Sequence, residues 1–108
     1  MSEVFGLDQL LARRVQARKS YLEFLRVPAI SAGIYVLPKG AVDSQQSHAE
    51  DEIYYVAGGK ANIRIGTEVR PVGEGSVIFV ETGLEHHFLD IEQDLVVPVV
   101  FGPAESMP

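Results

Sequence analysis

Short apolar runs separated by turns fill the chain from residue 30 onward; most of the turns contain glycine, and the last is expected at residues 92–94. The runs are rich in Val, Ile, Tyr and Phe, which favour β-strands, and each run has the length of one strand. They span residues 30–37, 46–48, 52–57, 60–65, 68–72, 76–80, 86–91 and 95–101. So many strands in about 75 residues would leave long unpaired edges if they formed one flat sheet. The pattern therefore predicts an all-β sandwich or barrel.

The first part of the chain has a different period. Residues 7–26 predict a helix, with Asp8 as its N-cap. Leucine and valine follow helical spacing at Leu7, Leu10, Leu11 and Val15. The apolar surface continues beyond these residues, as helix or as extended chain, until Pro28 ends any helix. We therefore expect an N-terminal helical arm at residues 1–27 and a β barrel at residues 28–108.

Composition narrows the classes of protein that fit this pattern. The 108 residues are 46% hydrophobic, which is enough for the core of one domain. The absence of cysteine excludes disulfides, thiolate zinc sites and a cysteine nucleophile. A net charge of −6 argues against nucleic acid as a partner, and no apolar run is long enough to span a membrane. With no apolar leader segment at the start, we expect a cytoplasmic protein.

Side chains that bind metals are concentrated at residues 46–52. Gln46 and His48 lie on the same face of an extended chain, because side chains alternate between faces. Glu52 has the same parity, but it can converge with them only if the chain turns between residues 49 and 51. Glu50 shares that parity, so spacing alone leaves both carboxylates possible.

A fourth ligand must come from elsewhere in the chain. His86 and His87 are the remaining histidines, and alternation lets only one of them face inward. Two nitrogen and two oxygen ligands suit zinc, iron, manganese or nickel. The sequence thus predicts one divalent metal ion.

The strand at residues 52–57 is apolar on both faces. If Glu52 faces inward, Tyr54 and Val56 also face inward, and Ile53 and Tyr55 face outward. Because the outer face then needs cover, we expect a second subunit and hence a homodimer. The interior also receives Ile63, Ile65 and either Ile78 or Phe79, which favours a small, partly hydrophobic ligand.

Two spaced motifs resemble those of the cupin superfamily over roughly residues 30–101. The first family motif is G-x5-H-x-H-x3,4-E-x6-G; here it runs from Gly40 to Gly59, with Gln46 in place of the first histidine. The second is G-x5-P-x-G-x2-H-x3-N; here it runs from Gly75 to Asp90, with Glu81 in place of proline and Asp90 in place of asparagine.

This resemblance implies a small jelly-roll barrel, also called a double-stranded β-helix, with its ligands at one mouth. The metal ligands that it implies are Gln46, His48, Glu52 and His86, with His87 facing out. Replacement of the first histidine by an amide should weaken metal binding without abolishing it, since a similar ligand set holds zinc in cupin-type phosphomannose isomerases. The alternative is a barrel that has lost its metal.

Cupin barrels host several classes of function, so fold alone does not decide among them. Our first hypothesis is a metal-dependent enzyme, of dioxygenase, isomerase or lyase type, that acts on a small organic acid or carbonyl compound. Glu52 and Tyr54 are its candidate catalytic residues, as proton carriers. The second hypothesis is a non-catalytic module that binds or senses a small molecule. The third is a barrel retained only for assembly.

Overall fold

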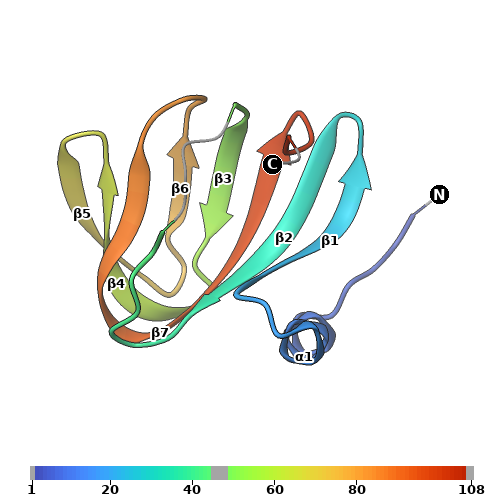
Figure 1. Cartoon of the computed structure of the whole chain (residues 1–108), viewed down its shortest axis with the longest axis horizontal. Helices are drawn as coiled ribbons and strands as arrows, with labels where there is room; N and C mark the ends of the chain where they lie inside the picture. Colours follow the sequence, from blue (N-terminus) through green and yellow to red (C-terminus); the bar gives the residue numbers. More distant parts are fainter. Residues whose placement is uncertain (1, 45–48, 107–108) are drawn as a thin grey trace.

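Antiparallel strands form a single rolled sheet in the computed structural model, which describes residues 2–44 and 49–106 (Figure 1). The strands are β1 (Tyr21–Val27), β2 (Ile30–Leu37), β3 (Asp51–Tyr55), β4 (Gly58–Ile65), β5 (Glu68–Gly73), β6 (Val77–Val80) and β7 (His86–Gly102). They follow the order β1-β2-β7-β3-β6, and the β4–β5 hairpin joins through β7. The all-β jelly-roll prediction is confirmed. The predicted strand at residues 46–48 lies outside the described residues.

Strand β7 connects the two halves of the roll. Its first half pairs with β4, and its second half pairs with β2 and β3. The prediction of two strands with a turn at residues 92–94 is therefore wrong. The strand bends instead: Asp90 has φ 51° and accepts a hydrogen bond from the Asn62 amide at 2.9 Å. Aspartate tolerates this left-handed conformation better than most residues, so the strand can pass from one half of the roll to the other.

The N-terminal helix is shorter than predicted. Helix α1 covers Leu7–Ala17, with Gly6 at the N-cap position, and ends where Arg18 adopts φ 55°. Asp8 therefore lies in the first turn, where its charge favours the helix N-terminus. Residues 21–27, most of which were predicted as the second half of the helix, form β1 instead. Pairing with β2 stabilises this segment more than an exposed turn of helix would. The division of the chain at residue 27 stays a prediction.

The core lies on the concave face of the roll. In the second half of β7, alternate residues have exposed fractions of 1% or less, namely Leu95, Val97, Val99 and Phe101. Tyr54 and Val56 are fully buried, whereas Ile53 and Tyr55 are about half exposed, as alternation predicted. Ile78 faces inward at 8% exposed and Phe79 outward at 60%, which decides the pair that the sequence left open.

Helix α1 packs against β1 and β2 on the right-hand side of Figure 1. Its one buried residue is Leu10, and Ile34 on β2 is fully buried. Within residues 2–44 and 49–106, no helix has the length and apolar character needed to cross a membrane.

Candidate metal centre

Three polar side chains meet inside the barrel, although the surroundings are apolar. Glu52 and Tyr54 come from β3, and His86 is the first residue of β7. Each has an exposed fraction of 2% or less. The chain bends at residues 49–50 just before β3, which confirms the predicted turn and sets Glu52 at the start of the strand.

Direct contacts join the three groups. The Glu52 Oε1 and His86 Nε2 atoms are 2.5 Å apart. The Tyr54 hydroxyl donates to Glu52 Oε1 at 3.2 Å and lies 2.9 Å from His86 Nε2. A buried carboxylate and imidazole are costly unless each is paired, and here they pair with each other.

The opposite nitrogen of His86 fixes the orientation of the ring. Nδ1 lies 2.9 Å from the Leu84 carbonyl oxygen, to which it donates. Burial lowers the pKa of His86, but the hydrogen bonds to Glu52 and Leu84 and the negative charges of Glu52 and Asp43 outweigh burial and raise the pKa above its ordinary value. In the protonated ring, Nε2–H therefore points at the Glu52 carboxylate.

Tyr54 stays protonated at neutral pH. Burial, and after it the charge of Glu52, raise the pKa of its hydroxyl well above 10. Tyr54 is thus a hydrogen-bond donor in this centre and is unsuited to act as a base.

The other predicted site residues have different positions. Gln46 and His48 lie outside the described residues. His87 faces out, as expected, with its Nε2 3.4 Å from a Glu85 carboxylate oxygen. Glu50 is buried, but its Oε2 accepts a hydrogen bond from Ser106 and not from the centre.

The geometry of Glu52 and His86 fits a metal site in part. A carboxylate oxygen and an imidazole nitrogen point at each other, and a backbone carbonyl holds the far nitrogen of the ring, as is usual for metal-binding histidines. A proton on Nε2 occupies the direction in which a cation would bind. Among the described residues, no group of three His, Cys, Asp or Glu side chains could hold an ion, so a site also needs ligands such as Gln46 and His48.

The interior contains further polar residues that the sequence pattern did not identify. Asp43 is 8% exposed, and its Oδ2 accepts a hydrogen bond from the Phe88 backbone amide at 2.8 Å. Tyr21 and Tyr35 pair across β1 and β2 with ring centroids 4.5 Å apart. Alternation along residues 30–37 could have identified Tyr35. Tyr21 could not be identified because the sequence predicted a helix at its position, and Asp43 is fixed by a hydrogen bond to a residue 45 positions away.

Comparison with known proteins agrees with this architecture. The family pattern described as "Cupin domain" matches residues 33–101. An uncharacterised protein of Streptomyces coelicolor is 46% identical over 104 residues, which is 96% of this chain and 99% of that protein.

Solved structures show the same fold at low identity. A double-stranded β-helix protein of unknown role from Klebsiella pneumoniae superimposes with a TM-score of 0.77 at 15% identity, over 100% of both chains. The DMSP lyase DddQ of Ruegeria pomeroyi superimposes with a TM-score of 0.65 at 22% identity, over 70% of this chain and 39% of the lyase.

Proposed function

Because the chain belongs to the cupin domain family, we propose that it is a mononuclear divalent-metal enzyme that acts on a small organic acid or carbonyl compound. The reaction is of the dioxygenase, isomerase or lyase type. The observation that carries this proposal is the buried pair of Glu52 and His86, whose facing atoms are 2.5 Å apart inside the barrel. Such a pair contributes little net stability, so its burial has a better explanation in ligand binding.

The proposed ligands are Gln46, His48, Glu52 and His86. Zinc, iron, manganese and nickel all accept this mixture of nitrogen and oxygen donors. A bound divalent ion would polarise a substrate carboxylate or carbonyl.

The remaining residues of the centre hold groups in place and supply protons. The Leu84 carbonyl keeps Nδ1 of His86 protonated, which directs Nε2 toward Glu52. As proton carriers we propose Tyr54, whose hydroxyl stays protonated, and Glu52, which accepts its hydrogen bond. Apolar neighbours such as Phe88, whose ring lies 5.2 Å from that of Tyr54, keep water from the interior.

The comparisons support an enzyme only in general terms. DddQ is a lyase on the same fold, so this barrel architecture can carry catalysis. Fold does not determine the substrate, so the DMSP lyase activity of DddQ is not assigned to this chain.

Elemental analysis of protein purified without chelator tests the metal site. We expect about one divalent ion per chain in the wild type, and at least about a tenfold loss of metal affinity in His86→Ala and Glu52→Gln, because each removes a direct ligand. His87→Ala is the matched control, since it removes the neighbouring histidine, which faces out. Equal metal content in the wild type and His86→Ala would contradict the proposal.

A second candidate function is a non-catalytic module that binds a small molecule. It is favoured by the direct contacts among Glu52, Tyr54 and His86, in which the carboxylate and the imidazole pair with each other. Turnover assays on metal-loaded protein separate the two functions. A thermal-shift assay alone does not distinguish them, because a ligand at a hundred times its dissociation constant would stabilise either kind of protein by about 2.7 kcal/mol.

The cytoplasmic location and the homodimer remain parts of this proposal. The location rests on the absence of cysteine from the sequence. The homodimer rests on the exposed apolar outer face around Ile53 and Tyr55.

A further inference from the structure

The loop between β6 and β7 is tied to the bend that leads into β3. We call residues 81–85 the β6–β7 loop and residues 49–51 the β3 bend. The Thr82 hydroxyl donates a hydrogen bond to the Ala49 carbonyl oxygen at 2.6 Å, and the Thr82 backbone amide donates one to Asp51 Oδ1 at 2.8 Å. The bonded residues are 33 and 31 positions apart in the sequence, so one threonine makes two tertiary contacts between these segments.

The β6–β7 loop has an ordered conformation of its own. Gly83 has φ 75°, which glycine adopts without strain, and the Leu84 amide donates to the Glu81 carbonyl oxygen at 3.3 Å to close a turn. At the end of the loop, the Glu85 carbonyl oxygen accepts a hydrogen bond from the Gly66 amide at 2.8 Å. The loop is therefore fixed at the end nearer to β7 as well as by its threonine.

The threonine completes a ring of contacts around His86. On one side of the imidazole, Nδ1 lies 2.9 Å from the carbonyl oxygen of Leu84, a residue of the β6–β7 loop. On the other side, Nε2 lies 2.5 Å from Oε1 of Glu52, which directly follows Asp51 in the chain. Because Thr82 joins the two segments, its hydrogen bonds influence the position of both groups that hold the imidazole.

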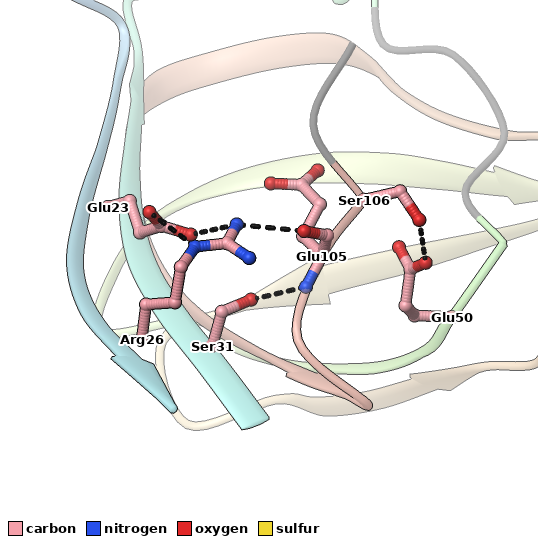
Figure 2. Close-up of polar contacts among 6 residues, drawn as sticks. All are labelled: Glu23, Arg26, Ser31, Glu50, Glu105 and Ser106. Atoms are coloured by element: carbon pink, nitrogen blue, oxygen red, sulfur yellow. Dashed lines mark hydrogen bonds and ion pairs between the residues drawn. The ribbon is translucent and has the colours of Figure 1, made fainter. Parts of the chain in front are cut away.

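The β3 bend is also held by the C-terminal end of the chain (Figure 2). The Ser106 hydroxyl donates to Glu50 Oε2 at 2.6 Å, and Glu50 is 5% exposed. The backbone before this serine is fixed too: the Glu105 amide donates to Ser31 Oγ at 2.7 Å, and its carbonyl oxygen accepts a hydrogen bond from Arg26 Nη2 at 2.8 Å. The Glu50 carboxylate is thereby directed to the C-terminal segment, and the other carboxylate of the same parity enters the candidate metal centre.

We propose that Thr82 is a positioning residue of the candidate metal centre. It keeps the Glu52 carboxylate and the Nε2 atom of His86 directed at each other, and it acts through the β3 bend and the β6–β7 loop. This inference rests on the proposed function and adds a residue that is not among the proposed ligands. Residues that orient metal ligands are important for binding, and their loss typically lowers metal affinity by about 10–100-fold.

Calorimetric titration of chelator-treated protein with Zn²⁺, Mn²⁺ and Ni²⁺ tests this role. Thr82→Val removes the hydroxyl while nearly keeping the shape of the side chain, and the exposed position means that no core cavity forms. For the ion that the wild type binds most tightly, we expect the affinity to fall about tenfold in Thr82→Val. Thr82→Ser keeps the hydroxyl and should bind within about twofold of the wild type.

The only other threonine of the sequence provides the matched control. Thr67 is exposed in the turn between β4 and β5, so Thr67→Val should keep the wild-type metal affinity. Circular dichroism and melting temperature confirm the fold of each variant. An affinity loss in Thr67→Val as large as that in Thr82→Val would overturn the inference.

Amide hydrogen exchange, measured by NMR on the metal-free protein, tests the same role without an ion. In Thr82→Val we expect the amides of residues 51–53 to exchange at least about fivefold faster, while those of β1 and β2 change by less than about twofold, because the loss is local. A contribution to global stability alone would instead speed exchange throughout the sheet. Asp51→Ala removes the acceptor of the Thr82 amide and should speed the exchange of that amide.

The outcomes distinguish this inference from the proposed function. A wild type that binds none of the ions removes the proposed function, while locally faster exchange in Thr82→Val would still support the positioning role. Equal exchange at residues 51–53 in the wild type and Thr82→Val overturns the inference whatever the metal does. Where the wild type binds an ion, an unchanged affinity in Thr82→Val also overturns it and leaves the proposed function intact.

Discussion

Individual residues show why a buried polar group in this barrel needs a specific partner. His86 is held on one side by the Leu84 carbonyl and on the other by Glu52, and Asp43 is held by the Phe88 amide. The family motifs selected Glu52 and His86 as inward residues, and alternation from Glu52 then placed Tyr54 inward as well. Their mutual contacts could not be predicted, because a distance of 2.5 Å between β3 and β7 depends on how the sheet curls.

Buried tyrosines should make the protein sensitive to alkaline pH. The pKa values of Tyr21, Tyr35 and Tyr54 are all raised, in each case chiefly by burial. A raised pKa in the folded state means that the stabilising contribution is complete below about pH 10 and is lost as the pH rises further, because the unfolded phenols ionise first. We expect the free energy of unfolding to fall above pH 10, by up to about 1.4 kcal/mol per pH unit for each buried phenol.

Denaturant titrations from pH 9 to pH 11.5 measure this slope. Tyr35→Phe should make the slope shallower, whereas Tyr55→Phe, at a position that is 47% exposed, should leave it unchanged. Equal slopes in the two variants would show that burial of Tyr35 is not the cause.

At the scale of the elements, helix α1 and strand β1 are placed by tertiary packing. The sequence has one apolar period from Leu7 onward, and local propensity alone does not stop the helix after Ala17. The left-handed conformation of Arg18 ends it, and the pairing of β1 with β2 extends the sheet. Side-chain burial then determines which helix positions contribute to the stability of the fold, since Leu10 is 6% exposed and Leu7 is 40% exposed.

Shortening Leu10 should destabilise the fold far more than shortening Leu7. We expect Leu10→Ala to lower the free energy of unfolding by about 2–4 kcal/mol, because it leaves a cavity between α1 and the sheet. Leu7→Ala should cost less than about 1 kcal/mol, because much of that side chain remains in water. Chemical denaturation measures both, and similar losses would mean that α1 does not pack through Leu10.

For the whole molecule, the outer face of the sheet has an uncovered apolar patch. It consists of Ile53, Tyr55, Val77, Phe79 and Val100, which lie on the adjacent strands β3, β6 and β7 and are between 42% and 68% exposed. Within residues 2–44 and 49–106, strand β6 lies at the edge of the sheet and has no charged residue, and natural proteins usually protect such edges. Because the patch is uncharged, two copies of it can meet without burying an unpaired charge.

We expect the protein to dimerise through this patch. Phe79→Asp places a carboxylate at its centre and should weaken dimerisation by at least about a hundredfold, because a buried unpaired charge is costly. Light scattering with size-exclusion chromatography measures the mass. Val69→Asp, at an exposed valine on β5 that is not part of the patch, should remain dimeric. A wild type that is monomeric at micromolar concentration would contradict the expectation.

The sequence by itself determined the all-β class, the turn before β3 and the two motifs of the family, which select Glu52 and His86 and, by alternation, the inward face of Tyr54. These features depend on alternation, turn residues and spacing, all of which are local along the chain. Only the tertiary structure decided where α1 ends, that β7 is continuous and that Tyr21 lies over Gly33. Each of these depends on contacts between residues far apart in the sequence, whose energies outweigh local preference and leave no periodic signal.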